Sequence, residues 1–325
     1  MIETAAEPGG AACTVVIVTR NRPDDLHVAI GSCLAQSVPV EVLVYDDASD
    51  RDLAAGVREA FAGRPVRAER LDSPVGYIPL RNRGFREASA NVVLSLDDDA
   101  YFCRTDAIES AVETLDRHPE AFAVAIPFAE RPRPGLVAAR PTPLPPEGTT
   151  VRNYIGCSHA VHRDEVLAAG GYRESLVHQV EERDLAIRML AQGRGVVTGQ
   201  SIGIVHNYSP VRDVGRLNRY GIRNTLLVTG WNAPLPHAAG RIAVDAVQLI
   251  RHRFSLRSLP ARLATIAGAI ATLVRTPGER QPVSAATWRR FRRLPTTGPV
   301  IVDKLPEPVG KTTTAVASAR QEVAS

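Results

Sequence analysis

The sequence predicts an α/β fold in which a mostly parallel sheet is flanked by helices and followed by a helical extension. Strand-like and helix-like segments alternate four times before residue 100 of the 325, with short loops between them. That alternation is typical of parallel βα units with helices on both faces of the sheet. Two of the strands end in acidic residues, and beyond Pro210 the apolar pattern is wholly helical. We therefore expect one large α/β domain with a C-terminal appendage.

The first four strands are predicted from short runs of β-branched and aliphatic residues, which fit a buried sheet. They cover residues 14–19, 40–45, 66–71 and 92–96. The helices between them are predicted from apolar residues at helical spacing. The first begins at Pro23, because proline followed by two aspartates is typical of a helix start. The second runs to about Phe61, and the third contains Leu80 and Phe85.

The rest of the chain is predicted to continue the sheet and then to become helical. Six prolines between residues 132 and 146 predict a long irregular excursion near the site. Helices are expected at 105–117, 180–190, 217–230, 239–254 and 258–274, and strands at 122–126, 195–198 and 202–205. Residues 1–11 and the tail 296–325, which is rich in Pro, Thr, Ala and Ser, are expected to be disordered.

Charge is distributed unevenly along the chain. The net charge is +4, and from Arg241 to Arg293 the basic residues are nearly all arginine, with few acids. This asymmetry predicts an anionic membrane surface or an anionic partner for the C-terminal helices, with a solvated basic helix face as the alternative. Aromatic residues make up 5% of the chain and are not interleaved with basic ones, which argues against binding to nucleic acid.

Cysteine usage and hydropathy predict the compartment. The four cysteines are scattered without the spacing of a metal finger, which fits buried thiols in a reducing environment. The first residues are acidic and polar, unlike a signal peptide. The longest apolar stretch, 263–274, is shorter than the roughly 20 residues that a membrane-spanning helix needs. We expect a cytoplasmic protein, with peripheral contact at the inner face of the cell membrane as a further expectation.

The acidic triplet Asp97-Asp98-Asp99 follows a predicted buried strand directly. Three adjacent carboxylates repel one another and are costly to bury without a cation. In open α/β sheets the ligand crevice lies outside the carboxyl ends of the strands. The triplet is therefore a candidate site for a divalent cation and its ligand. The alternative is a solvated acidic turn that caps the helix beginning near Thr105.

Four blocks of sequence, in this order, resemble the family-two inverting glycosyltransferases with a GT-A fold. The blocks are Ile17-Val18-Thr19-Arg20-Asn21-Arg22, Val44-Tyr45-Asp46-Asp47-Ala48-Ser49, Leu96-Asp97-Asp98-Asp99 and Glu181-Glu182-Arg183-Asp184-Leu185-Ala186-Ile187-Arg188. Between the second and third blocks, the segment 76–84 looks like the family's Gly-x-x-x-x-Arg-Asn-x-Gly pattern. Each block alone is weak, but the four in order are specific. The resemblance covers roughly residues 13–208.

The resemblance implies a GT-A, Rossmann-like nucleotide-diphospho-sugar transferase fold. It also implies that different parts of the chain bind the donor and the acceptor. Residues 12–210 would form the catalytic domain, with a nucleotide-sugar half at about 12–100 and an acceptor half at about 101–210. Residues 211–295 would be a C-terminal helical extension that covers the acceptor site, forms a homodimer or lies on a membrane. The partners implied are a UDP- or dTDP-linked sugar donor and an acceptor with a hydroxyl group, in glycan, glycolipid or glycosylated-metabolite biosynthesis.

The donor side, by resemblance, uses residues that follow the first, second and fourth strands. Asp47 would accept a hydrogen bond from the imide N–H of uracil or thymine, since a carboxylate is an acceptor only. A backbone group of Thr19 would also meet the base. Arg20 and Arg22 edge the same pocket, either as diphosphate ligands or as ordinary surface arginines. Arg81 is either a diphosphate or sugar contact or the ion-pair partner of one of the triplet acids.

The metal site implied by the resemblance is the Asp-x-Asp pattern within the triplet. Asp97 would face the ribose and contribute to the metal site, and Asp99 would bind the cation, while Asp98 has no assigned role. Hard oxygen ligands suit Mg²⁺ or Mn²⁺, which would neutralise the departing diphosphate. His206 ends a later strand where family members often carry a third metal ligand; the alternative is a structural histidine.

The catalytic base, by resemblance, lies in Glu181-Glu182-Arg183-Asp184-Leu185, where the family usually has Glu-Asp-x-Asp-Leu. An inverting transfer needs a carboxylate on the face opposite the leaving group to take the proton of the acceptor hydroxyl. Glu182 occupies the position of the usual base, and Glu181 is the alternative. Asp184 points away from Glu182 on a helix and is spaced to pair with Arg188, so we interpret that pair as structural.

Two other functions remain open on the same residues. One is a non-catalytic nucleotide-sugar- or glycan-binding protein with the same fold. The other is a nucleotide-sugar pyrophosphorylase, which also uses acids and metal on an α/β sheet. Pyrophosphorylases normally carry a glycine-rich phosphate loop after the first strand, and this chain has none there. The leading hypothesis is therefore a metal-dependent, inverting glycosyltransferase.

Overall fold

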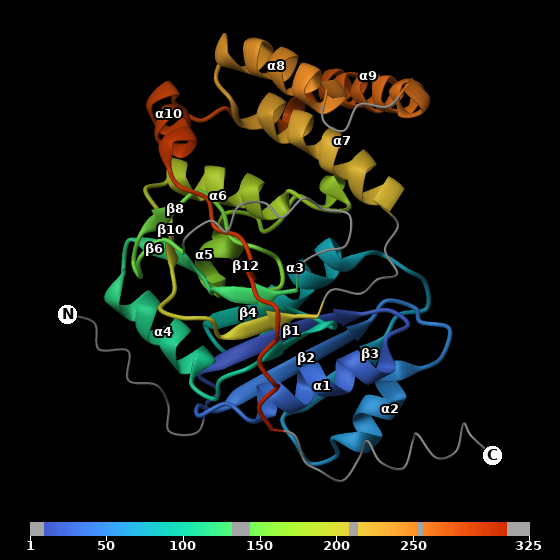
Figure 1. The fold of residues 1–325 in the computed structure, drawn as a ribbon, viewed down its shortest axis with the longest axis vertical. Helices are drawn as coiled ribbons and strands as arrows, with labels where there is room; N and C mark the ends of the chain where they lie inside the picture. Colours follow the sequence, from blue (N-terminus) through green and yellow to red (C-terminus); the bar gives the residue numbers. More distant parts are fainter. Residues whose placement is uncertain (1–9, 132–143, 208–213, 252–255, 311–325) are drawn as a thin grey trace.

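In the computed structural model the protein has a central sheet with helices on both faces, and a further group of C-terminal helices lies beyond the helices of one face (Figure 1). The structure describes residues 10–131, 144–207, 214–251 and 256–310. Residues 132–143 of the Pro-rich excursion and residues 1–9 of the N-terminal segment expected to be disordered lie outside these residues.

The main sheet has eight strands in the order β3-β2-β1-β4-β9-β6-β10-β8. Their bounds are β1 Cys13–Thr19, β2 Val40–Asp46, β3 Val66–Arg70, β4 Val92–Asp97, β6 Ala121–Ala125, β8 Thr150–Val151, β9 His159–His162 and β10 Gly195–Thr198. Strands β1 to β4 are parallel, whereas β9 is antiparallel to both β4 and β6. The predicted α/β class and mostly parallel sheet are confirmed.

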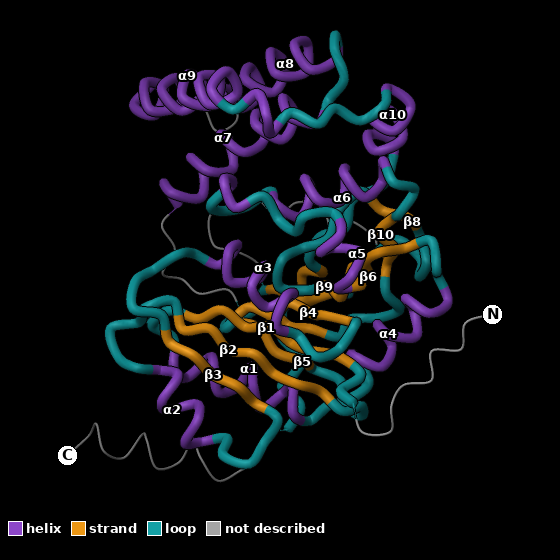
Figure 2. Tube along the Cα trace, turned by 180° about the vertical axis from the view of Figure 1, so that it is seen from behind, coloured by secondary structure: helices purple, strands orange, loops and turns teal. Residues whose placement is uncertain are grey.

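Side-chain alternation along the strands divides the core between the two faces of the sheet. On β1, Val15 and Ile17 pack with α1 (Pro23–Leu34), α2 (Leu53–Ala60) and α4 (Ala107–Arg117). Val16 faces the other way, toward α3 (Tyr77–Glu87), α5 (Arg163–Ala168) and α6 (Glu181–Ala191). Figures 1 and 2 show these helices covering opposite faces. Each buried aliphatic side chain stabilises the fold by about 1.5–3 kcal/mol, so the strands are held from both sides.

Helix α3 approaches the sheet very closely at Gly84. A Cβ atom at this position would lie 2.6 Å from a methyl group of Val16, which is buried in β1. Glycine therefore lets the backbone of α3 sit directly on the strand. This contact explains in physical terms why the segment 76–84 ends in glycine, and it fixes the height of Arg81 over the sheet.

A second, four-stranded sheet lies beside the main one, in the order β12-β7-β11-β5. Its strands are β5 Ala100–Phe102, β7 Phe128–Glu130, β11 Ile204–His206 and β12 Val300–Ile301. β5 begins three residues after β4 ends, so the acidic triplet is the junction between the two sheets. β11 is antiparallel to β5, and His206 is paired with Ala100.

The C-terminal helices form an outer layer, over α6 (Figures 1 and 2). They are α7 Val214–Asn232, α8 His237–Arg251, α9 Leu259–Arg275 and α10 Ala285–Arg293. The sequence predicts the first three but does not single out α10. Asn232 of α7 donates a hydrogen bond to buried Asp184 of α6 (2.7 Å), and Trp231 is buried between the layers. These contacts attach the helical layer to the α/β body.

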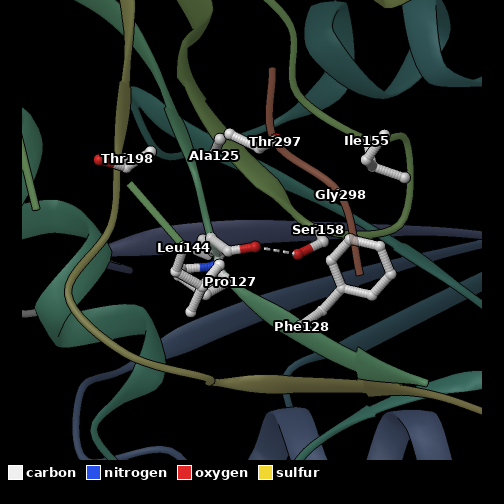
Figure 3. Close-up of a pocket in the computed structure, with 10 residues that line it drawn as sticks. Ala125, Pro127, Phe128, Leu144, Ile155, Ser158, Thr198, Thr297 and Gly298 are labelled. Atoms are coloured by element: carbon white, nitrogen blue, oxygen red, sulfur yellow. Dashed lines mark hydrogen bonds between the residues drawn. The ribbon is translucent and has the colours of Figure 1, made fainter. Parts of the chain in front are cut away.

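The predicted disorder from residue 296 onward is wrong for residues 296–310. The main chain of Arg152 donates to the carbonyl of Pro295, and Asn153 makes two hydrogen bonds with Thr297. Figure 3 shows Thr297 and Gly298 beside Ile155 and Ser158 in a small pocket. Beyond it, β12 pairs with β7 and Leu305 is buried. Tertiary packing orders this segment despite its composition, and residues 311–325 lie outside the described residues.

Two further expectations concern cysteines and membrane spans. All four cysteines are free; Cys13, Cys33 and Cys157 are buried and Cys103 is partly exposed. Among the helices of the described residues, none combines the length and the apolar character needed to cross a bilayer.

Candidate active site

The acids predicted to act together follow β2 and β4, the two strands that flank β1. In the register of the sheet, Thr19 at the end of β1 pairs with Asp46 on β2, and Val18 pairs with Asp97 on β4. Strands β2 and β3 lie on one side of β1, and β4 lies on the other side. The order in which strands are added to the sheet therefore reverses at β1. A ligand crevice is expected outside the strand ends at such a point. Asp47 and the triplet therefore lie on the same edge of the sheet.

Asp98, the middle acid, points back toward the loop after β1. Its carboxylate accepts hydrogen bonds from the hydroxyl of Thr19 (2.9 Å) and from Arg22 (2.7 Å). Burial raises the pKa of Asp98 to about 6, against the opposing effect of Arg22. Asp98 thus holds the loop that carries Arg22, a role that the sequence leaves unassigned. Arg20, by contrast, is exposed on the same loop.

Asp99 is buried and lies between Arg22 and His206. One carboxylate oxygen is 2.9 Å from an Arg22 nitrogen, and the other is 3.2 Å from Nε2 of His206. The second ring nitrogen, Nδ1, lies 2.6 Å from Oε1 of Glu130 on β7. Burial would lower the pKa of His206, but the hydrogen bonds with Asp99 and Glu130 outweigh it and raise the pKa to about 9. Glu130 therefore fixes the orientation of the ring.

Asp97 is the most solvent-accessible acid of the triplet. Its side chain is 34% exposed, against 7% for Asp98 and 1% for Asp99. One oxygen of Asp97 lies 4.0 Å from Nε2 of His206. The three predicted ligands Asp97, Asp99 and His206 are thus brought together, and Asp97 is the most exposed of the three.

The donor atoms at this point fit a divalent cation. Ligand atoms of Asp97, Cys157 and His206 all lie within 4.8 Å of one another, and Asp99 adds a carboxylate next to His206. Burial raises the pKa of the Cys157 thiol well above its usual value, so a protonated sulfur adds little for a hard ion. The remaining carboxylate oxygens and imidazole nitrogen suit Mn²⁺ or Mg²⁺.

Asp47 lies on the loop after β2, at the same edge of the sheet. Its carboxylate accepts hydrogen bonds from the backbone N–H groups of Val75 (2.7 Å) and Gly76 (3.1 Å). Its own N–H donates to the carbonyl of Thr19 (2.9 Å). Asp47 therefore ties together the loops after β1, β2 and β3. Each carboxylate oxygen has more than one lone pair, so the group retains acceptor capacity for a ligand.

Arg81 connects the strand end to the start of α6. One guanidinium nitrogen lies 2.7 Å from Asp97, and another lies 3.3 Å from Glu181. The group is buried and lies over the ring of Tyr77, 4.7 Å from its centroid. Of the two roles predicted for Arg81, the ion pair with a triplet acid is present, and contact with a diphosphate or sugar stays a prediction.

The two glutamates open α6 after a strained turn. Positive φ angles occur at Val177, Gln179 and Val180 (62°, 66° and 74°). This conformation is costly for residues other than glycine, and most of all for the two β-branched valines. The amide of Asn224 on α7 holds the turn by donating to the carbonyls of Leu176 and Gln179 (2.8 and 2.9 Å). Strain that the surroundings hold in place is common where side chains must be positioned for function.

Glu181 and Glu182 differ in their surroundings. Glu181 is fully buried against Arg81, whereas Glu182 lines a cavity. Burial and the neighbouring charge of Glu181 raise the pKa of Glu182 well above its ordinary value. Asp184 turns away and pairs with Arg188 at 2.9 Å, as predicted from their spacing. Of the two candidate bases, Glu182 is the one with access to a bound molecule.

The cavity beside Glu182 has a volume of about 790 Å³ and lies between the α/β body and the C-terminal helices. Its lining residues come from the segment after β8 and from α6, α7, α8 and α10. They are Arg152, Asn153, Tyr154, Ile155, Val180, Glu182, Arg183, Ile187, Thr225, Val228, Thr229, Arg241, Asp245, Gln248, Leu249, Trp288, Phe291, Arg292 and Thr296. This size is typical of a site for a small organic ligand.

Some of these residues were not predicted. Glu130 and Cys157 meet His206 and Asp97 only because separate strands bring them together, and no local pattern marks either one. Arg152, Arg241 and Arg292 come from different elements and line one cavity. For Arg241 and Arg292, the only indication in the sequence was the excess of arginine from Arg241 to Arg293.

The fold defines the class of protein: it is the GT-A fold. Staphylococcus aureus TarS 1–349 in complex with UDP-GlcNAc is similar over 81% of this chain and 80% of that chain, with a TM-score of 0.59 and 15% identity. The mannosyltransferase PcManGT from Pyrobaculum calidifontis, in complex with GDP-Man and Mn²⁺, is similar over 89% and 81%, with a TM-score of 0.55 and 19% identity.

The family follows from the sequence of the first half. Residues 14–160 match the family model described as glycosyl transferase family 2, which confirms the predicted resemblance to family-two glycosyltransferases. The uncharacterized glycosyltransferase YwdF of Bacillus subtilis (strain 168) is 28% identical over 106 residues, which are 32% of this chain and 39% of YwdF. The alignment thus spans less than half the length of that relative.

Proposed function

We propose that this protein is an inverting glycosyltransferase that moves a sugar from a nucleotide-sugar donor to a hydroxyl group of an acceptor. The observation that carries this proposal is the position of Arg81. It bonds to Asp97 at the strand ends and to Glu181 beside the cavity. The donor sugar at the strand ends and the acceptor in the cavity would then lie on either side of the buried Arg81 side chain. Glu182 would lie on the acceptor side.

The donor would bind along the carboxyl ends of β1, β2 and β4. Asp47 and the main chain near Thr19 would meet the base, and Arg20, Arg22, Arg81 and the acids Asp97 and Asp98 would border the ribose and diphosphate. A carboxylate at position 47 supports a UDP- or dTDP-linked sugar, because uracil and thymine present an imide N–H. The two solved structures above are complexes with a UDP-sugar and a GDP-sugar, so the fold alone does not select the base.

A divalent cation would be held by Asp97, Asp99 and His206. When bound, it would neutralise the diphosphate of the leaving group. The imidazole ligand favours Mn²⁺ over Mg²⁺ at such a site. Glu130 would keep the ring of His206 in the orientation that ligation needs.

Glu182 would act as the base. Direct displacement at the anomeric carbon needs a carboxylate opposite the leaving group to take the proton of the incoming hydroxyl. A raised pKa suits this role, since a base is most efficient when its pKa lies near the working pH. Burial raises the pKa of Glu181 as well, and the positive charge of Arg81 opposes this rise and favours the ionised form.

Glu182→Gln, compared with Glu181→Gln, tests the assignment. Removing a general base costs typically 10²–10⁴-fold in rate, so E182Q should lose about this much transfer. Initial rates with a UDP- or dTDP-sugar and Mn²⁺ would be measured alongside thermal unfolding, which controls for folding. Full turnover by E182Q would show that Glu182 is not the base.

A non-catalytic nucleotide-sugar- or glycan-binding protein is the alternative function on the same residues. Both functions predict that nucleoside diphosphates with Mn²⁺ raise the melting temperature, because a ligand that binds only the folded state stabilises it. They differ in turnover. Release of free nucleoside diphosphate that requires an acceptor supports the enzyme, and tight binding without release across many acceptors supports the alternative.

The C-terminal helices would make peripheral contact with an anionic membrane or form a homodimer. Exposed apolar side chains support such a contact, among them Val247 on α8 and Leu263, Ile270 and Val274 on α9. Exposed Arg251 and Arg257 lie on the same helices or between them, whereas Arg253 lies outside the described residues. Co-sedimentation of the full chain with anionic liposomes, compared with an R251Q/R257Q variant, tests the membrane contact. Equal sedimentation of the two proteins would argue against it.

A further inference from the structure

The cavity beside Glu182 has an unusual distribution of charge. Four arginines line it, each from a different element: Arg152 after β8, Arg183 on α6, Arg241 on α8 and Arg292 on α10. Arg241 forms an ion pair with Asp245 on the same helix. In the described parts of the chain, Arg152, Arg183 and Arg292 form no ion pair with a carboxylate. The cavity wall therefore carries more positive charge than its own acids neutralise.

The arginines also disfavour one another. Burial, and then the nearby charges of Arg292 and Arg241, lower the pKa of Arg152. Burial lowers the pKa of Arg183 too, with the attraction of Asp245 only partly compensating. Gathering like charges in a partly desolvated space costs free energy. Such an arrangement becomes favourable when an anion binds among them.

Guanidinium groups are well suited to one class of anion. Their planar forks donate paired hydrogen bonds to the oxygens of phosphate. The rest of the cavity is different in character, because Trp288 and Phe291 of α10 are nearly buried and their rings stack with centroids 6.0 Å apart. A ligand with one charged group and one less polar part would match both walls.

We propose that this cavity binds a phosphate group of the acceptor, held by Arg152, Arg183 and Arg292, so that a neighbouring hydroxyl of the same molecule faces Glu182. This inference rests on the proposed glycosyl transfer, because it assigns the substrate class of the acceptor side. The donor diphosphate belongs elsewhere, at the strand ends with Asp97, on the other side of Arg81. The cavity thus provides a second site for phosphate in the same protein.

Binding can be measured without turnover. The full chain is first saturated with UDP and Mn²⁺ to fill the donor side. Methyl phosphate is then titrated by calorimetry, and methyl sulfate and methanol serve as a singly charged and an uncharged comparison. We expect methyl phosphate to bind more tightly than methyl sulfate and methanol to show no binding. The affinity should fall as salt is raised, because the contact is between charges. Equal affinity for the charged and uncharged probes would overturn the proposal.

Variants locate the site. Arg183→Gln and Arg292→Gln should each weaken methyl phosphate binding by about tenfold or more, since a hydrogen bond to a charged group contributes roughly 1.5–3 kcal/mol. Arg289→Gln is the matched control, because Arg289 is exposed on the same helix as Arg292 and does not line the cavity. Arg292 is also exposed, so its replacement leaves the fold intact. Unchanged binding in both R183Q and R292Q would overturn the proposal.

The source of the phosphate is distinguished by a second probe. Phosphatidylcholine vesicles that contain a minority of phosphatidic acid present the same group on a lipid. If R183Q weakens binding to these vesicles as well as to methyl phosphate, the acceptor is lipid-linked. If it weakens only methyl phosphate binding, the acceptor is a soluble phosphorylated molecule. Vesicle binding that depends on Arg251 and Arg257 alone belongs to the membrane contact and counts against the cavity as a lipid site.

The outcome is separable from that of the proposed function. If sugar transfer occurs only with neutral acceptors and R183Q leaves its rate unchanged, the cavity proposal fails and the transferase proposal stands. If methyl phosphate binding depends on Arg183 and Arg292 but no acceptor gives turnover, the binding site stands and the transferase proposal fails.

Discussion

The strand-end site and the cavity beside Glu182 handle charge in opposite ways. At the strand ends the buried charged groups are paired: Arg22 bonds to Asp98 and Asp99, Arg81 bonds to Asp97, and His206 lies between two carboxylates. In the cavity, three arginines have no carboxylate partner among the described residues. A paired network fixes geometry before a ligand arrives, whereas unpaired charge of one sign supplies affinity for a ligand of the other sign. The paired charges at the strand ends therefore hold side chains in position, whereas the unpaired arginines of the cavity favour the binding of an anion.

The largest effect is expected from Asp99→Asn at the strand-end site. It removes one carboxylate charge from the proposed cation ligands while keeping the side-chain shape. Metal stabilisation of a leaving group is worth several kcal/mol, so initial transfer rates should fall about 10³-fold.

Asp98→Asn is the matched control for D99N. Its amide oxygen can still accept the hydrogen bond from Thr19, and the carboxylate of Asp98 contacts Thr19 and Arg22. The loss of rate should be at least about tenfold smaller than in D99N, because no proposed cation ligand changes. Equal losses of transfer rate in D98N and D99N would mean that the triplet acts through packing alone. Asp99 would then not have a separate role as a cation ligand.

Glu130→Gln should have the next largest effect. The hydrogen bond from His206 would remain, but the charge that makes the imidazole a better ligand would be gone. Replacing an outer partner of this kind typically weakens metal affinity by about 10–100-fold. Titration with Mn²⁺ in the presence of UDP measures it. Unchanged Mn²⁺ affinity would remove His206 from the proposed ligand set.

The strand-end site could be predicted from the sequence because its residues follow strands directly. An apolar run that ends in Asp97-Asp98-Asp99 gives both the strand and the position of the acids, and parallel strands place Asp47 on the same edge. Glu130 and Cys157 could not be found in this way, because the pairing of β7 with β11 and the path of the chain after β8 bring them there. The same holds for the arginines of the cavity, which share no element.

The helical boundaries and the tail show a similar limit. Apolar spacing predicts α7, α8 and α9 to within a few residues, because their buried faces repeat along the chain. The segment 296–310 has no such repeat, and its order comes from pairing of β12 with β7 and from Leu305 in a small core. Composition alone therefore predicts disorder for residues that tertiary contacts hold in place.

The pH dependence of transfer should report Glu182. A carboxylate takes a proton only when it is ionised, so a raised pKa moves the acid limb of the rate profile to higher pH. Below that pKa, kcat/KM should fall about tenfold per pH unit, and above it the rate should be flat until another group titrates. Measurement of kcat/KM in overlapping buffers, with unfolding monitored in parallel, tests this. An acid limb at the ordinary glutamate pKa would mean that the charge of Glu181 and the burial of Glu182 are relieved when the donor binds.

Gly84→Ala should have the smallest effect, and it tests the connection between the two sites. The new Cβ would press against Val16, a buried and stiff β-branched residue, and overpacking of this kind costs about 1–3 kcal/mol of unfolding free energy. Gly56→Ala in α2 meets no atom within 4 Å, so it should be neutral or stabilise by up to about 1 kcal/mol. Chemical denaturation measures both. Because α3 carries Arg81, G84A should also weaken the nucleotide-induced rise in melting temperature, whereas G56A should not. If G84A lowers stability but leaves nucleotide binding and transfer unchanged, the height of α3 over β1 does not control how Arg81 joins the two sites.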